Sequence, residues 1–147
     1  MFLLALPLYA ENEALLVTAV VKDESAQDIY QALDVKSVRE TDITDVEQQR
    51  KRVGPLTCRK TTLFSLPRRE STIHYLCELV SENASEHSEE NVASVSGEDA
   101  RVIYEALQVT EEYVRDPIST FVKRVGTLQC SKSRLLGTEN FFCSLKE

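Results

Sequence analysis

The chain of 147 residues has no tryptophan, only two histidines, and only four glycines and four prolines. It contains no Gly-rich phosphate-binding loop, no Gly-x-Ser-x-Gly sequence and no His-Glu-x-x-His sequence. These short motifs hold phosphates, nucleophiles or metal ions in common enzyme classes. His74 and His87 belong to no such motif. We therefore expect no catalytic residues and no cofactor, and we predict that the protein is not an enzyme.

Close cysteine pairs are also absent, because no Cys-x-x-Cys sequence occurs among the four cysteines. Zinc sites usually present cysteine ligands as pairs two to four residues apart, so zinc is the weaker interpretation and we predict no metal site. Four well-spaced cysteines are typical of a disulfide framework in an exported protein. The cysteines are Cys58, Cys77, Cys130 and Cys143.

The first ten residues contain no charged side chain, and charge begins abruptly at Glu11. An apolar run this short cannot cross a bilayer, which requires about 20 residues, but it matches the apolar part of a secretory signal. We interpret residues 1–10 as a signal peptide, with a buried N-terminal strand as the alternative. The prediction is a secreted or periplasmic protein with no stable membrane anchor after cleavage.

Three blocks of the sequence occur twice in the same order, at offsets of 74, 72 and 66 positions. The pairs are Ser25–Val35 with Asp99–Val109, Lys51–Lys60 with Lys123–Lys132, and Cys77–Leu79 with Cys143–Leu145. A repeat of this length is a supersecondary unit that stacks on its own copy. We predict a first α+β repeat over residues 11–80, an acidic linker over 81–91 and a second α+β repeat over 92–147.

Each repeat has the pattern of a strand, a helix and two further strands. Apolar residues share one face of each predicted helix, at spacings of three and four: Ala26, Ile29, Tyr30 and Leu33, and then Ala100, Ile103, Tyr104 and Leu107. The expected fold is α+β, with two tandem β-α-β-β repeats forming an antiparallel-rich sheet that has the helices on one face. The block from Lys51 is interpreted as one strand ending at Cys58, and residues 45–50 could form a short helix.

The cysteine positions predict two disulfide-stapled hairpins. If Cys58 lies opposite Cys77, opposed residue numbers sum to 135 and the turn is centred on Pro67-Arg68. If Cys130 lies opposite Cys143, the sum is 273 and the turn is centred on Leu136-Gly137. Both centres contain a residue that favours turns. We expect both disulfides within repeats, with Cα atoms about 4.4–6.8 Å apart.

Charge is unevenly distributed although the net charge is −7. Residues 50–69 and 123–134 contain eleven of the 17 basic residues and no acidic residue. The predicted basic surface consists of Arg50, Lys51, Arg52, Arg59, Lys60, Lys123, Arg124, Lys132 and Arg134. Such a field attracts an acidic protein surface, whereas solvated edge residues are the alternative explanation. An acidic chain without tryptophan is a poor candidate for nucleic-acid binding.

The first hairpin has the longer and more basic tip, which we predict to be a contact site. Its candidate residues are Phe64, Leu66, Pro67, Arg68 and Arg69. In outline, a tandem, disulfide-stapled α+β repeat resembles secreted inhibitors of the β-lactamase inhibitory protein family, an analogy that carries no residues across. The expected function is a secreted, non-catalytic binding module that acts on a protein partner through its basic hairpins, and the resemblance implies an inhibitor. The alternative is a structural or self-associating envelope protein, and the oligomeric state stays open.

Overall fold

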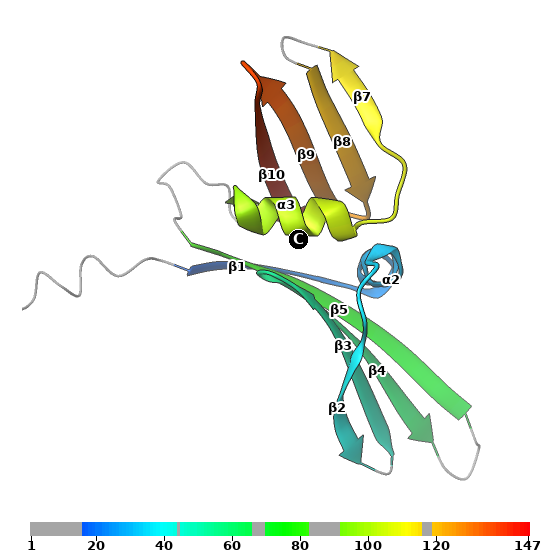
Figure 1. The fold of residues 1–147 in the computed structure, drawn as a ribbon. Coiled ribbons are helices and arrows are strands. Elements are labelled where there is room, and N and C mark those ends of the chain that lie inside the picture. Colours follow the sequence, from blue (N-terminus) through cyan, green and yellow to red (C-terminus); the bar gives the residue numbers. More distant parts are fainter. Residues whose placement is uncertain (1–15, 44, 66–69, 83–91, 116–118) are drawn as a thin grey trace, which may run out of the picture.

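The computed structural model describes residues 16–43, 45–65, 70–82, 92–115 and 119–147. Within these residues, ten strands and two helices form two separate five-stranded antiparallel sheets (Figure 1). The sequence suggested one sheet, so this expectation is corrected. The predicted signal peptide, most of the linker and the tip residues Leu66, Pro67, Arg68 and Arg69 lie outside the described residues.

The first unit contains one helix and five strands. In chain order these are β1 (Leu16–Lys22), α2 (Asp23–Ala32), β2 (Val38–Ile43), β3 (Val46–Val53), β4 (Leu56–Ser65) and β5 (Glu70–Glu82). The strands are ordered β1-β5-β4-β3-β2 across the sheet. After β1, the chain therefore runs through α2 to β2 at the far edge of the sheet, and it returns strand by strand until β5 lies beside β1.

The second unit contains the same kinds of element in the same order. They are β6 (Val92–Ser96), α3 (Glu98–Ala106), β7 (Glu112–Arg115), β8 (Ser119–Val125), β9 (Leu128–Leu135) and β10 (Thr138–Lys146). The strand order across this sheet is β6-β10-β9-β8-β7. Each unit thus has two more strands than the β-α-β-β pattern expected from the sequence.

The extra strands correct two local predictions. Residues 45–50 do not form a short helix, because β3 begins at Val46 and pairs with β2 on one side and β4 on the other. This pairing outweighs the weak helical propensity of a polar segment. The block from Lys51 is likewise not one strand, because Gly54-Pro55 forms a turn between β3 and β4, with Gly54 at a φ of +54°.

Both predicted disulfides and their registers are confirmed. Cys58 lies opposite and bonds to Cys77, and Cys130 does the same with Cys143. The Cα separation is 4.0 Å in both pairs, which is shorter than expected. The second turn is centred on Leu136-Gly137 as predicted. Ser65 lies opposite Glu70 in the first hairpin, whose turn falls outside the described residues.

The core lies where each helix packs on the strands that carry its disulfide. The apolar faces predicted for the two helices are buried, with Ile29 and Ile103 fully so. Fully burying one such side chain stabilises the fold by about 1.5–3 kcal/mol. Each helix also places a tyrosine edge-on to an aromatic ring of the neighbouring strand, as Tyr30 does with Tyr75 at a centroid distance of 5.6 Å.

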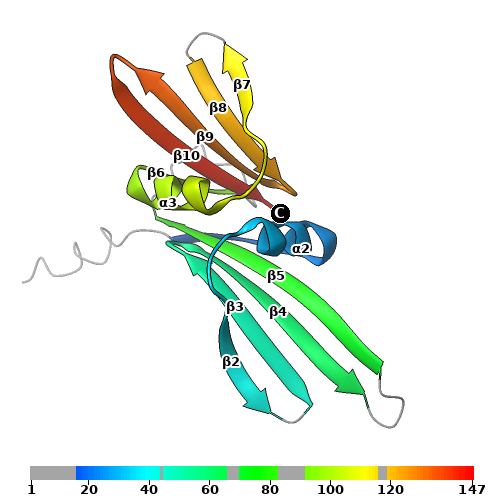
Figure 2. The ribbon, with the colours of Figure 1, turned by 45° about the vertical axis from the view of Figure 1, so that its right-hand side comes forward.

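The two units meet at the ends of their helices, and the hairpins project away from this junction in opposite directions (Figures 1 and 2). Leu33 and Leu107, which follow the helices, form an antiparallel bridge. The amide of Asp34 donates to the carbonyl of Ala106 at 2.8 Å. The amide of Gln108 donates to the carbonyl of Ala32 at the same distance. The junction is therefore reciprocal, with equivalent atoms exchanged between the units.

Candidate functional site

Two of the predicted basic residues cap the helices. The Lys51 ammonium donates to the carbonyl oxygens of Tyr30 and Leu33 at 2.9 and 3.0 Å. Lys123 donates to the equivalent carbonyls of Tyr104 and Leu107, both at 2.9 Å. Each ammonium also lies 4.5 Å from the centre of the tyrosine ring of its helix. Burial lowers the pKa of both lysines. A cation that satisfies the last carbonyls of a helix stabilises the fold, so this pair is structural.

Other predicted basic residues are neutralised by acidic neighbours on the sheets. Arg50 and Arg59 contact the Glu40 carboxylate at 3.2 and 3.1 Å, and Arg59 also contacts Glu78. Arg124 pairs with Glu112 at 2.6 Å. Arg52 is exposed, with its guanidinium 3.5 Å from the carbonyl of Gly54. The predicted basic surface is thus not brought together as one patch.

Lys132 belongs to a row of side chains that crosses the second sheet. Strand pairing places Phe141 opposite Lys132, Lys132 opposite Phe121, and Phe121 opposite Tyr113. The Lys132 ammonium lies 5.1 Å from the centre of the Phe121 ring, and the Phe121 and Tyr113 rings are 5.2 Å apart. Stacked aromatic and cationic groups of this kind bind apolar and charged partners. We call these four residues the aromatic row.

The equivalent row of the first sheet is polar. Pairing there aligns Tyr75 with Lys60, Lys60 with Gln49, and Gln49 with Arg39. The lysine is thus retained, and Tyr75 stands where the second sheet has Phe141. The two positions nearest the sheet edge are Gln and Arg instead of Phe and Tyr. Phe121 packs against the hydrophobic core, but Tyr113 is exposed at the sheet edge. Because the first sheet has the same strand order with Arg39 at the corresponding edge position, the fold does not require an aromatic residue there.

A hollow of about 440 Å³ lies against the aromatic row. It is lined by Tyr113, Ser119, Phe121, Lys132, Arg134 and Glu139. Arg134 pairs with Glu139 at 2.9 Å, and the hydroxyls of Tyr113 and Ser119 are 3.0 Å apart. Two aromatic rings with cationic groups beside them can contact an apolar side chain of another protein that has an acidic residue next to it. The predicted residues Lys132 and Arg134 are therefore brought together here.

The carboxylate of Glu111 contacts two residues at this site, Tyr104 and Lys132. The Tyr104 hydroxyl donates to this carboxylate at 2.6 Å, and the Lys132 ammonium lies 3.8 Å away. Burial raises the pKa of Tyr104 well above its ordinary value, and the hydrogen bond and negative charge of Glu111 raise it further. Tyr104 therefore stays a neutral donor, and it orients the carboxylate that holds Lys132.

The tip of the second hairpin exposes two leucines, which directly follow Arg134 of the hollow in the sequence. Leu135 is 49% exposed, and Leu136 is 96% exposed with a φ of +53°. A left-handed backbone costs a residue that has a Cβ atom about 1–2 kcal/mol, and Asn or Gly is the usual choice in such a turn. Leu136 is therefore unfavourable for folding in both its backbone and its exposure. In the first hairpin the predicted contact residue Phe64 is 45% exposed.

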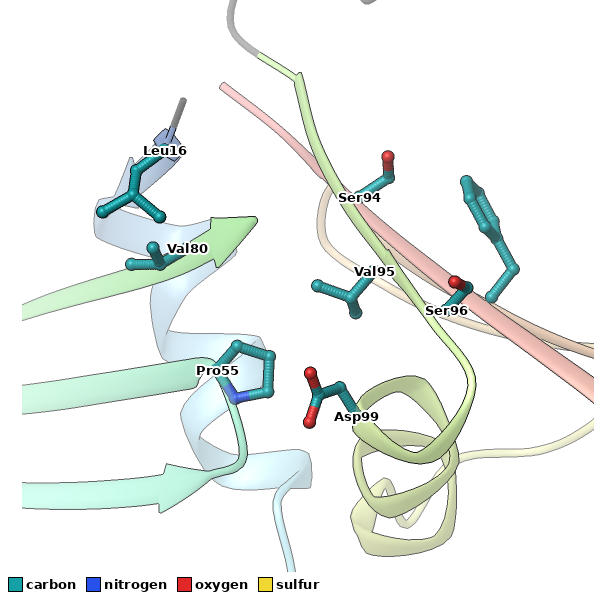
Figure 3. A pocket seen from close by; sticks show the side chains of 8 residues that line it. Leu16, Pro55, Val80, Ser94, Val95, Ser96 and Asp99 are labelled. Carbon is teal, nitrogen blue, oxygen red and sulfur yellow. The ribbon is translucent and has the colours of Figure 1, made fainter. Parts of the chain in front are cut away.

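A second cleft lies between the two units and is lined by Leu16, Pro55, Val80, Ser94, Val95, Ser96, Asp99 and Phe142. Figure 3 shows Pro55 and Asp99 facing each other across it. The equivalent place at the other end of the junction is also hollow, between Val21, Ser25 and Thr127. This symmetry indicates that both clefts arise from how the units pack, so we place the candidate site at the aromatic row.

The sequence interpretation missed Tyr113 and Phe121. Tyr113 lies within residues 110–119 and Phe121 lies just after them, and the sequence pattern of this segment predicts no particular element. The alternation of Ser119, Phe121 and Lys123 on one face of a strand was the signal available. Only the pairing of four strands places these side chains in one row.

Searches of protein-family models, curated proteins and solved structures find no match to this chain. Within the described ranges, no helix has both the length and the apolar character that crossing a membrane requires. No group of three or more His, Cys, Asp or Glu side chains in that part of the chain could hold a metal ion. The site must therefore be interpreted from its own geometry.

Proposed function

We propose that this protein is a secreted or periplasmic, non-catalytic binding module that recognises an acidic protein surface through its hairpins. The contact surface is the tip of the second hairpin together with the aromatic row. The tip of the first hairpin, from Phe64 to Arg69, is the second contact. Because the hairpins point in opposite directions (Figure 2), the two tips engage separate regions or separate partners. Inhibition would follow if a tip occupied a partner's functional groove.

The observation that carries this proposal is Leu136. An apolar side chain that is 96% exposed, in a backbone conformation that Leu rarely adopts, is maintained at a cost to stability. Unfavourable conformations of this kind cluster at ligand contacts. The neighbouring Arg134 and Lys132 contact Glu139 and Glu111 within the chain, but a guanidinium has five donors and an ammonium three, so both can also donate to an acidic group of a partner.

Localisation and repeat architecture are part of the same proposal. Two intramolecular disulfides are typical of extracellular or periplasmic proteins. We propose that the units are tandem copies of one repeat, each with its helix on one face of its sheet. The shared strand order, the paired disulfides and the helix-capping lysines support this. Because the second copy alone has aromatic side chains at its edge, we assign the two copies different contacts.

Substituting Leu136 by Asn tests the proposed function. Asn tolerates the left-handed backbone, so Leu136→Asn should raise the free energy of unfolding by about 1 kcal/mol. Wild type and variant would be immobilised, proteins captured from the host's extracellular fluid identified, and each candidate's dissociation constant measured with purified protein. We expect binding at least about tenfold weaker for the variant, a loss of about 1.4 kcal/mol.

Leu16→Asn is the matched control, because Leu16 is also an exposed leucine, at 64%, and lies on β1 far from the hairpin tip. This control should bind the partner as tightly as wild type does. Equal affinity of Leu136→Asn and wild type for every captured protein would reject the hairpin tip as the contact surface.

A further inference from the structure

Strand β7 is the open edge of the second sheet, where its backbone pairs with β8 on one side only (Figure 1). The pairing runs without interruption from Glu112 to Arg115. All four residues are exposed, with Tyr113 at 55% and Val114 at 39%. An uninterrupted edge strand with β-favouring residues at its centre is a template for pairing with another chain.

The equivalent edge of the first sheet is protected against such pairing. Strand β2 has a register shift between Arg39 and Thr41, and its residue in the cross-strand row is the charged Arg39. Bulges and charged side chains are the usual means of preventing edge-to-edge association. The uninterrupted strand β7 has neither a bulge nor a charge at its centre, so the two edges of one molecule differ in this respect.

The charges along β7 favour antiparallel pairing with an identical strand. Glu111 and Glu112 lie at its beginning and Arg115 at its end. Glu112 already pairs with Arg124, and one carboxylate oxygen of Glu111 contacts Tyr104 and Lys132. Arg115 has no ion-pair partner among the residues that the structure describes. Antiparallel copies place the basic end of each strand beside the acidic end of the other, while parallel copies place like charges together.

We propose that two copies of this chain associate through β7 to form a continuous ten-stranded antiparallel sheet. In an antiparallel pair, the side chains of two opposed residues lie on the same face of the sheet. A twofold axis between two identical strands therefore requires the residue numbers of each opposed pair to have an even sum. Centring the axis on Tyr113 places the two Tyr113 rings opposite each other. The same register places Arg115 of each copy opposite Glu111 of the other, twice. The aromatic rows then join into one row across the dimer.

The mass of the protein in solution tests this proposal. Sedimentation equilibrium over a range of concentrations should give a mass that rises to that of a dimer for the wild type. The variant Tyr113→Lys places two like charges opposite each other, and Arg115→Glu opposes two acidic groups. We expect the dissociation constant of the dimer to increase at least about tenfold for each. Val38→Lys, at the exposed edge of β2, is the matched control and should leave the dimer unchanged.

A monomeric mass for the wild type at every concentration would overturn the proposal. So would dimers of unchanged affinity for both edge variants, with circular dichroism confirming that they are folded. Cysteine cross-linking tests the register separately. Tyr113→Cys should form a disulfide between copies under mild oxidation, and Val114→Cys should not, because it faces residue 112 of the other copy. The reverse pattern would reject the register centred on Tyr113.

Discussion

Gly126 provides a quantitative test of how the two units pack. This glycine lies in the turn between β8 and β9, has a φ of +59° and approaches the beginning of helix α2 in the other unit. A Cβ atom added here would lie 2.4 Å from the Ser25 hydroxyl oxygen and 3.0 Å from the Ser25 carbonyl oxygen. The hydroxyl also accepts a hydrogen bond from the Thr127 amide at 3.1 Å. Gly126→Ala must therefore displace the helix, break this hydrogen bond, or both.

The expected cost has two parts. Placing Ala in the left-handed region costs about 1 kcal/mol, and overpacking a close contact costs typically about 1–3 kcal/mol more. We predict that Gly126→Ala lowers the free energy of unfolding by about 2–4 kcal/mol in urea denaturation with the disulfides intact. Gly137→Ala is the matched control, because Gly137 has a φ of +80° and nothing within 4 Å of an added Cβ. Gly137→Ala should lower the free energy of unfolding only by the cost of placing Ala in the left-handed region, about 1 kcal/mol.

Gly54 occupies the equivalent turn of the first unit and gives an intermediate case. Its added Cβ would lie 3.2 Å from a methyl group of Val102, a side chain that can move. The expected destabilisation is therefore smallest for Gly137→Ala, intermediate for Gly54→Ala and largest for Gly126→Ala. If Gly126→Ala costs no more than Gly137→Ala, the contact between the β8–β9 turn and helix α2 does not contribute to stability, and the reasoning about the junction fails.

Two further predictions concern buried polar groups. Lys51→Met and Lys123→Met remove an ammonium that caps a helix but keep most of the aliphatic chain, so each should lower the free energy of unfolding by about 1–3 kcal/mol. Lys60→Met, which removes no such cap, should cost less in the same urea titration; equal costs for the three variants would contradict the capping role. The pKa of Tyr104 is raised in the folded protein, so the Tyr104 hydroxyl ionises at a lower pH in the unfolded chain than in the folded one. The stability that this hydroxyl contributes is therefore complete below pH about 10 and declines above it. Ultraviolet titration of wild type and Tyr104→Phe should show that the variant lacks the last tyrosine to ionise, and identical titration curves would refute this.

The sequence alone determined the parts of the fold that depend on local pattern. The spacing of Ala26, Ile29 and Tyr30 specified a helix with one buried face, because side chains three and four positions apart share a face. The position of Gly137 and the spacing of the second cysteine pair specified that hairpin's register, because a two-residue turn fixes which residues are opposed. These features require no information about distant segments.

Only the tertiary structure decided which residues form the candidate site. Phe121 and Tyr113 join Lys132 in one row because three strands pair side by side, and no local pattern specifies that pairing. The predicted basic surface was divided for the same reason. Lys51 and Lys123 turned inward to helix carbonyls, and Arg59 found Glu40 on a neighbouring strand. Charge counted along a chain cannot reveal a partner that folding brings from elsewhere, because ion pairs depend on separation in space.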